Sequence, residues 1–511
     1  MQKKRILALG LSLCMFGGLL AGCGAEEKKP ETDNGTETTE SLDDMAAYFA
    51  EKDHYTIKVM CFGDSDSTTV EKISEKISEY TEEALNCDVE ITRMGFANYM
   101  TQLNMDLSSG EEFDLFIPMA APIDYVNAGQ IQPITDLIPE FAPNLNAVME
   151  ERDWLTNTFD GDIYGLPNYQ NKATVLGVGM RKDICDELGI DYENMSSWDD
   201  YHDALVKVKN AYPDMYPIAS NGGNMFSGET AYTGQDSCGD TYNLAVLEDP
   251  YDENGKVQSW FETEQFAEVT NRMYEWAQEG LIQPDASTST DDVNLLVASG
   301  KAFSYFQHTK PGWEEEESGK SNTEIVCWRY GTPNYIGYQT AWFVPTASGD
   351  PERAVAFYDM MYSNKEISNL VINGLEGENY VFANEEKTVI TYPDGVDPTS
   401  TTYMRLPWEW ANGSIAYPWD NEDPALWEEY DNFGKSAEVP VAFGFNFDAT
   451  AVMNEVTACV NVYQKYVPAL LCGSLDPETT IPKLNEEMKA AGIEKIVAEK
   501  QRQLDEYLAG K

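Results

Sequence analysis

Residues 160–185 constrain the fold of this chain most, because local structure is expected to change three times within this short stretch. Asp160 and Gly161 favour a tight hairpin turn, since Gly readily adopts the positive φ that two-residue turns require. Pro167 holds the residue before it in an extended conformation, and the apolar run 173–180 is typical of a buried strand. A turn, an extended polar segment and a buried strand suit a chain that crosses from one lobe to another. We therefore expect a ligand to bind against this crossing.

The length of the chain also favours two lobes, because 511 residues exceed what one hydrophobic core usually holds. The composition, 42% hydrophobic and 24% charged, is typical of a globular protein. The net charge is −54; without the three basic residues of the leader described below it is −57, with 31 basic against 88 acidic residues. Such a surface repels nucleic acid and anionic lipid, so we expect neither as a partner. Solubility explains the charge most simply, and an acidic pocket for a cationic ligand is the alternative.

The N-terminus has the features of an export signal. A basic start (Lys3–Arg5) and an apolar run too short to span a membrane precede Leu20-Ala-Gly-Cys23, which resembles the bacterial lipobox. We expect residues 1–22 to be a lipoprotein signal peptide and Cys23 to be lipidated, with polar residues 23–52 as a disordered tether. The chain would then be held by lipid alone on the outer face of the cell membrane, or on the periplasmic side where two membranes exist. An ordinary signal peptide that happens to contain Cys is the alternative.

The remaining cysteines are odd in number, scattered, and free of any CxxC pair. Exported proteins with disulfides usually contain paired cysteines. We therefore expect buried thiols outside disulfides at all seven positions: Cys61, Cys87, Cys185, Cys238, Cys327, Cys459 and Cys472.

Strand and helix signals alternate at the start of the mature chain. Strands are expected at 55–62, 89–94 and 113–117, with helices from Thr68 or Thr69 to about residue 85 and over 98–107. This βαβαβ order predicts a parallel sheet, in which ligands bind beyond the carboxyl ends of the strands. Those ends are occupied by Asp64 and Ser65, and by Pro118 and Met119.

Periodic segments continue through the rest of the chain. Helices are expected at 183–188, 201–209, 263–279, 293–299, 350–362 and 449–466, followed by a final helix broken near Gly492. Strands are expected at 300–306 and 340–345, and the charged run 314–320 is interpreted as solvated and without further role. No repeat period is present.

The motifs of several enzyme classes are missing from the sequence. The only histidines, His54, His202 and His308, are far apart, and no HExxH, GxSxG, Walker A or GxGxxG motif occurs. We therefore name no catalytic residue, metal ligand or cofactor. The segment 252–255 is like part of a calcium loop, but Pro and Phe occupy its first and twelfth positions, so an EF-hand is rejected and only an irregular calcium site stays open.

A binding surface is the remaining hypothesis. Tyr and Trp present apolar faces with polar edges, which suit sugar rings flanked by Asp, Asn or Gln. For each aromatic residue core packing is the alternative, and for His308 it is a structural role. The predicted ligand-binding residues are Asp64, Ser65, Pro118, Met119, Tyr169, Gln170, Asn171, Gln307, His308, Tyr338, Trp408, Trp410 and Asn412.

Several short motifs, in a specific order, resemble those of bacterial extracellular solute-binding proteins of ABC importers. They are the lipobox and the segments 129–138, 160–167, 181–183, 197–201, 280–282 and 300–302. The segments 373–380, 443–448 and 499–504 look like the extra C-terminal region of LipO-like lipoproteins. The resemblance implies an α/β fold of the two-lobed periplasmic-binding-protein type, with mixed or parallel sheets flanked by helices, a hinge between the lobes and an added, mostly helical C-terminal region.

In this interpretation lobe 1 comprises residues 53–168 and 303–346, and lobe 2 comprises 169–302 and 347–511, with the extension from about residue 400. The resemblance implies a monomer without enzymatic activity, which captures a solute, expected to be an oligosaccharide, and delivers it to ABC permease subunits. A secreted hydrolase acting on polysaccharides is one alternative. A surface sensor or adhesin that serves no transporter is another.

Overall fold

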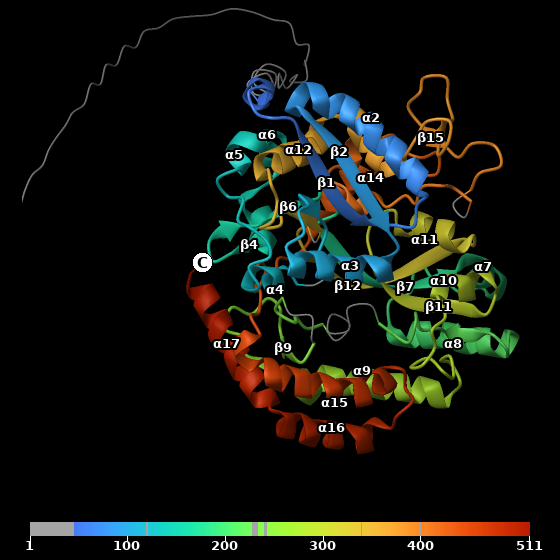
Figure 1. Ribbon diagram of the computed structural model, residues 1–511. Coiled ribbons are helices and arrows are strands. Elements are labelled where there is room, and N and C mark those ends of the chain that lie inside the picture. Colours follow the sequence, from blue (N-terminus) through green and yellow to red (C-terminus); the bar gives the residue numbers. More distant parts are fainter. Residues whose placement is uncertain are drawn as a thin grey trace, which may run out of the picture.

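The computed structural model describes residues 45–118, 121–226, 234–239, 243–338, 340–397 and 400–510. These residues form two α/β lobes, one above the other in Figure 1, as the sequence predicts. The signal peptide, Cys23, most of the tether and Met119 lie outside the described residues. No helix of the described ranges is long and apolar enough to cross a membrane.

Lobe 1 is built on a sheet of strand order β2-β1-β3-β13-β6. Its strands are β1 (Tyr55–Phe62), β2 (Cys87–Met94), β3 (Leu115–Phe116), β6 (Gly165–Pro167) and β13 (Ala341–Phe343). β1 is parallel to both β2 and β3, which confirms the expected βαβαβ unit. Its connecting helices are α2 (Ser67–Leu85) and α3 (Phe96–Ser109). The N-cap of α2 is Asp66, whose carboxylate accepts from the backbone N–H groups of Thr68 and Thr69. The predicted cap at Thr68 or Thr69 was therefore two or three residues too late.

Short elements complete the edge of lobe 1. They are α4 (Pro122–Asn127), α5 (Ile138–Phe141), α6 (Pro143–Val148), the 3₁₀ helix η1 (Glu151–Asn157) and the hairpin of β4 (Thr158–Phe159) with β5 (Asp162–Ile163). The hairpin turns at Asp160 and Gly161, with φ values of 52° and 91°. The predicted two-residue turn is therefore confirmed.

Lobe 2 contains a second sheet of order β12-β7-β11-β8. Its strands are β7 (Ala173–Arg181), β8 (Tyr216–Ile218), β11 (Ala302–Thr309) and β12 (Ile325–Tyr335), with β9 (Ala245–Leu247) and β10 (Val257–Ser259) forming a separate pair. The surrounding helices are α7 (Lys182–Leu188), α8 (Trp198–Ala211), η3 (Trp260–Glu262), α9 (Glu264–Gln278), α10 (Val293–Ala298) and α11 (Trp313–Ser321).

The lobe boundaries differ from the expected ones in two places. β11 and β12 flank β7 as antiparallel neighbours, so residues 303–335 lie in lobe 2 rather than lobe 1. The charged run 314–320, interpreted above as solvated and without further role, forms most of α11. Glu317 in that helix is buried and accepts a 2.8 Å hydrogen bond from the Tyr305 hydroxyl, which gives the run a packed face.

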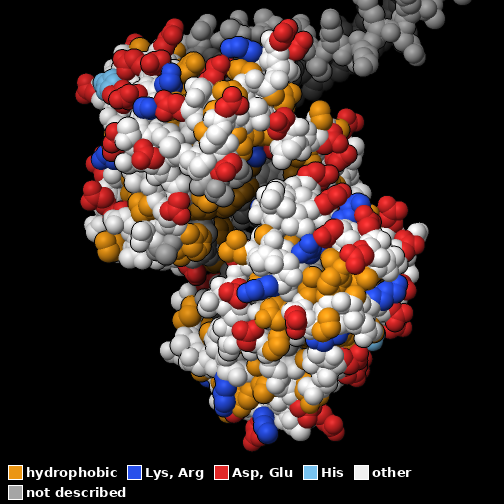
Figure 2. All heavy atoms as spheres, turned by 90° about the vertical axis from the view of Figure 1, so that its right-hand side faces the viewer, with side chains coloured by type: hydrophobic (Ala, Val, Ile, Leu, Met, Phe, Trp, Pro, Cys, Tyr) orange, Lys and Arg blue, Asp and Glu red, His pale blue; other side chains and the backbone are white. Residues whose placement is uncertain are grey.

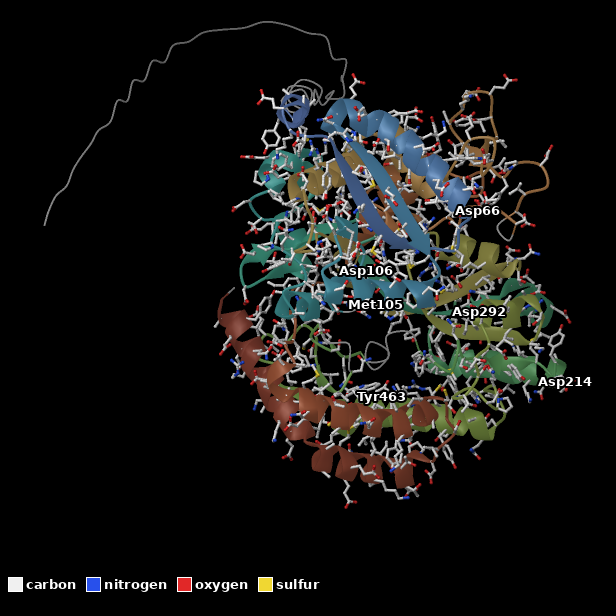
Figure 3. All side chains as sticks on the ribbon, in the orientation of Figure 1. Asp66, Met105, Asp106, Asp214, Asp292 and Tyr463 are labelled. Atoms are coloured by element: carbon white, nitrogen blue, oxygen red, sulfur yellow. The ribbon has the colours of Figure 1, made fainter. Side chains whose placement is uncertain are left out.

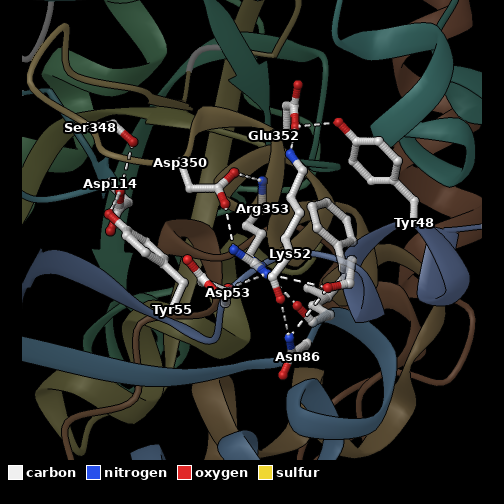
Figure 4. Close-up of polar contacts among 12 residues, drawn as sticks. Tyr48, Lys52, Asp53, Tyr55, Asn86, Asp114, Ser348, Asp350, Glu352 and Arg353 are labelled. Carbon is white, nitrogen blue, oxygen red and sulfur yellow. Dashed lines mark hydrogen bonds and ion pairs between the residues drawn. The ribbon is translucent and has the colours of Figure 1, made fainter.

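Residues 347–411 were expected in lobe 2, but they pack in lobe 1. α12 (Pro351–Ser363) and α13 (Lys365–Asn373) contribute to the same core as β1 and β2. Arg353, 2% exposed, explains part of this placement: it donates to Leu85 O and Asp53 O at 2.9 and 2.8 Å and pairs with Asp350 at 2.6 Å (Figure 4). Sequence periodicity could not reveal these distant backbone contacts.

The end of the predicted tether is also part of lobe 1. Residues 45–50 are helical, and Phe49 is fully buried beneath α12. Lys52 pairs with Glu352, which also accepts from the Tyr48 hydroxyl (Figure 4). Residues 45–52 therefore belong to lobe 1 rather than to the predicted tether.

The C-terminal part begins in lobe 1 and ends on lobe 2. It comprises β14 (Val381–Phe382), β15 (Ile390–Thr391), η4 (Pro407–Glu409), η5 (Gly413–Ile415), α14 (Leu426–Ser436), η6 (Thr450–Val452), α15 (Met453–Leu471), α16 (Pro477–Ala491) and α17 (Ile493–Ala509). The last three helices form the lower edge of Figure 1 and share one core with α9. This confirms the expected helical region, although its helices complete lobe 2 rather than form a separate unit.

Within the described residues the chain passes between the lobes three times, at residues 168–172, at residues 336–338 with residue 340, and at residues 412–441. The first two passages lie side by side, because Asn168 N donates to Thr340 O at 2.9 Å and Ile336 N donates to Lys172 O at 2.9 Å. The third begins beside the first, because Tyr169 N donates to Ala411 O at 2.6 Å and Tyr169 forms a β-bridge with Asn412. The predicted crossing is therefore one member of a three-part connection.

The seven described cysteines are present as thiols, and all but Cys327 are buried. Burial raises the pKa of Cys87, Cys185, Cys238 and Cys327 to about 12. A raised pKa keeps these groups as unreactive thiols.

Candidate functional site

A groove separates the two lobes, and hydrophobic side chains line its walls (Figure 2). At the carboxyl end of β1, the Phe62 ring packs between Phe96 and Trp408, with ring centroids 5.9 and 5.1 Å away. Phe62 is 5% exposed, whereas Phe96 and Trp408 are 57% and 39% exposed. We call these three residues the aromatic platform. Its two outer rings offer apolar surface at the sheet edge where α/β proteins bind ligands.

Two exposed methionines also lie on lobe 1. Met105, 55% exposed, lies on α3 at the side of lobe 1 nearest to lobe 2 (Figure 3). Met404 is 42% exposed, and its backbone N donates to Ser65 Oγ at 3.1 Å. Met404 therefore lies beside the carboxyl end of β1, where the platform is.

Polar side chains of the first passage hold the platform in place. Asn168 is fully buried and donates from Nδ2 to Trp408 O at 2.9 Å and to Glu409 O at 2.8 Å. Gln170, half-buried, also donates to Trp408 O. The sequence prediction thus placed Gln170 and Trp408 in one site, and the structure brings them into contact. Asp64, at the end of β1, is exposed at the same edge.

A buried ion pair lies directly beneath the platform. Arg93 Nη2 is 2.9 Å from Glu409 Oε2, and both side chains have 0% exposure. Glu409 Oε1 also accepts from Phe62 N at 3.0 Å. Burial raises the pKa of Glu409 to about 7, and Arg93 opposes the shift by stabilising the carboxylate. The pair joins β1 and β2 to the segment that carries Trp408.

Three other predicted residues, Tyr169, Tyr338 and Asn412, lie together at the inter-lobe connection. The Tyr169 ring is 5.8 Å from that of Tyr338 and stacks at 5.8 Å and 20° on Trp427 of α14. Tyr338 and Asn412 are 1% and 7% exposed, so they support the connection rather than face the groove. The Tyr338 hydroxyl has no hydrogen-bond partner among the described residues.

Trp410 differs most from its predicted role. It is 0% exposed and stacks on Trp342 with a centroid distance of 5.1 Å and an angle of 29°. Trp408 and Trp410 alternate along the chain, and only Trp408 points outward. Core packing, the alternative considered for each aromatic residue, applies to Trp410.

The remaining predicted residues are half-buried and separate from the platform. Asn171 donates to Ala173 O, and Gln307 Oε1 accepts from His308 N at 3.0 Å. Gln307 and His308 lie on β11 opposite Gly177 and Leu176 of β7. Pro118 follows β3 and is also half-buried. Their contact with ligand stays a prediction.

Four further residues complete the site but were not among the predicted ligand-binding residues: Arg93, Phe96, Asn168 and Glu409. Glu409 lies between the two candidate tryptophans in the sequence, and this position could have indicated that it belongs to the site. Arg93 and Glu409 are 316 positions apart, so nothing in the sequence pattern joins them.

Two groups of side chains contain the ligand atoms that cations prefer. His54, Glu82 and Asp88 place one ligand atom each within 4.8 Å of one another, but all three are exposed. In the 252–255 turn, Asp252 Oδ1 accepts from Asn254 N at 2.9 Å, which gives that carboxylate a role in the turn. The irregular calcium site stays a prediction.

Comparison with known proteins agrees with this architecture. Residues 64–367 match the family described as bacterial extracellular solute-binding protein, and residues 441–509 match a domain of unknown function (DUF3502). The chain belongs to the family of bacterial extracellular solute-binding proteins.

A curated relative from Streptococcus pneumoniae, a carbohydrate ABC transporter substrate-binding protein, is 24% identical over 464 residues, covering 89% of this chain and 91% of the relative. The N-glycan transport solute binding protein NgtS of S. pneumoniae has the same fold, with a TM-score of 0.78, 22% identity and coverage of 89% and 99% of the two chains. An extracellular solute-binding protein of Bifidobacterium longum subsp. infantis aligns with a TM-score of 0.64 at 16% identity, with coverage of 89% and 99%.

Proposed function

We propose that this protein captures an oligosaccharide in the groove between its lobes and delivers it to the permease of an ABC importer. The observation that carries the proposal is the aromatic platform, because two exposed rings face solvent at the carboxyl edge of the sheet. Phe96 and Trp408 would stack on the CH faces of sugar rings, and Asp64 and Gln170 would accept or donate hydrogen bonds to hydroxyls. The carbohydrate relative supports this choice of solute.

We also propose that ligand binding closes the lobes about the three passages. Asn168 links the first passage to the backbone of Trp408, so movement of the platform and movement at the connection would be coupled. A hinge of a few connecting residues is the usual way for two lobes to close on a ligand. Small-angle X-ray scattering of the mature chain should show a smaller radius of gyration with ligand than without it.

Binding can be tested by a thermal-shift screen of the mature protein against oligosaccharides, with peptides and polyamines as controls. A ligand that binds only the native state raises the melting temperature. Stabilisation by glycans alone is the expected result. Stabilisation by polyamines alone would instead favour the acidic pocket for a cationic ligand.

We further propose a monomeric protein without enzymatic activity that Cys23 anchors to the membrane through lipid. The lipobox-like tetrapeptide and the polar segment after it support the anchor. Fractionation of cells that express the natural chain and a Cys23→Ala variant tests it: the natural chain should be in the membrane fraction, and the variant should not be. Release of reducing sugar by the purified protein would contradict the absence of activity.

A further inference from the structure

We infer that the groove selects neutral oligosaccharides and rejects acidic ones, because the cations that adjoin the candidate residues are paired with carboxylates of the protein. This inference rests on the proposed function and adds the charge class of the ligand. Proteins that bind uronic or sialic acids need a donor, most often Arg, that is available to the ligand carboxylate. The four cations that adjoin the candidate residues, Arg93, Lys172, Lys310 and Arg405, are instead each paired with a carboxylate of the protein.

Arg93 is the guanidinium nearest to the platform, and its donors are used within the protein. Nη2 binds Glu409 Oε2 at 2.9 Å and Phe62 O at 3.0 Å, and Nε binds Phe62 O at 3.2 Å. Nη1 binds Met404 O at 2.9 Å and Ser65 Oγ at 3.3 Å. Since the side chain has 0% exposure, a ligand could reach Arg93 only after the platform is displaced.

The other cations next to the candidate residues are paired in the same way. Lys172 comes directly after Tyr169–Asn171 in the sequence, and its Nζ lies 2.7 Å from Asp153 Oδ2. Lys310 comes two residues after His308, and its Nζ lies 3.2 Å from Glu316 Oε2. Arg405 is next to Met404 in the sequence, and its Nη2 lies 2.7 Å from Glu422 Oε1. Each pair neutralises a charge that an acidic ligand would need.

Carboxylates are the charges left exposed at this edge. Asp64 and Asp66 both follow β1 and are exposed, and Asp66 uses its carboxylate to cap α2. A ligand carboxylate placed on the platform would meet these negative charges without a compensating cation. The hydroxyls of a neutral sugar can instead donate to Asp64 while its CH face covers Trp408.

A matched pair of ligand pools tests the inference. A pool of sialylated oligosaccharides is titrated into the mature protein before and after complete desialylation, with a non-sialylated neutral pool as reference. We expect the neutral pools to bind at least about tenfold more tightly than the sialylated pool. Equal or tighter binding of the sialylated pool would overturn the inference while leaving the proposed function intact. Failure of every pool to bind would overturn both.

Asp64→Asn identifies the source of the discrimination. This exposed substitution keeps the size of the side chain, and we expect it to strengthen binding of the sialylated pool about three- to tenfold relative to the neutral pool. Asp214→Asn, the same charge change in the exposed turn that follows α8, is the matched control and should leave the ratio unchanged (Figure 3). An equal effect of both variants would show that net charge, not the site, sets the preference.

Discussion

Arg93 Nη2 lies 2.9 Å from Glu409 Oε2, with neither side chain exposed to solvent. The contact joins the carboxyl ends of β1 and β2 to a segment more than 300 positions away, which carries the exposed Trp408. A buried ion pair stabilises a protein little more than a pair of apolar side chains would. Removal of one partner, however, leaves an uncompensated buried charge, which strongly lowers the free energy of unfolding. The pair therefore orders the platform.

Arg93→Met should destabilise the protein strongly. The substitution leaves the Glu409 carboxylate buried without its cation, for which losses of about 3–5 kcal/mol are typical. Urea unfolding at neutral pH, followed by circular dichroism, measures the free energy of unfolding. The control is Arg502→Met in α17, where the Arg side chain is 52% exposed and a much smaller loss of stability is expected. Similar losses in the two variants would mean that the buried pair has no special role.

Glu409→Gln should change how stability depends on pH. The pKa of Glu409 is about 7 in the folded protein, above its ordinary value of 4.5. Between these values the folded state binds more protons than the unfolded state, so this group lowers stability as the pH rises from about 4.5 to 7. The stability of the natural protein relative to the Gln variant should fall by up to about 3 kcal/mol over that range. A constant difference between the two unfolding free energies across these pH values would contradict the raised pKa.

The two tryptophans flanking Glu409 should behave differently. Trp408→Ala should weaken oligosaccharide binding about 10- to 100-fold, as loss of a central aromatic contact does, with a small effect on stability. Trp410→Ala should cost about 3–5 kcal/mol of stability, because it empties a fully buried position stacked on Trp342. Titration calorimetry and urea unfolding of both variants separate the two effects. The reverse assignment of the losses would contradict the geometry.

The cysteines should react slowly in the native protein and completely after unfolding. Six of the seven described thiols are buried, and only Cys327 is partly accessible. Titration with Ellman's reagent should therefore detect at most about one thiol per folded mature chain and seven in denaturant, with Cys23 blocked by lipid or substituted. Detection of about one thiol in denaturant would show that disulfides form in the exported protein.

Local patterns in the sequence predicted the elements of the fold well. β1, α2, β7 and α9 each follow from apolar spacing, and the turn at Asp160 follows from the Gly after it. The lobe boundaries could not be predicted in this way, because they depend on pairing between distant segments. β12 belongs to lobe 2 through its register with β7, and α12 belongs to lobe 1 through the contacts of Arg353.

The candidate site was predicted in part for the same reason. The alternation of Trp408 and Trp410 indicates that one faces solvent and one faces the core, but it does not indicate which. Glu409 and Asn168 decide this, since their contacts with Arg93 and with the backbone of Trp408 fix the orientation of η4. Such contacts are long-range and leave no periodic trace in the sequence.

The most direct test of the central claim is titration calorimetry of the mature protein with the best oligosaccharide from the thermal-shift screen, in parallel with the Trp408→Ala variant. The natural chain should bind one ligand per molecule, and the variant should bind at least about tenfold more weakly while its unfolding free energy changes little. Unchanged affinity in a well-folded Trp408→Ala variant would contradict the placement of the ligand on the aromatic platform.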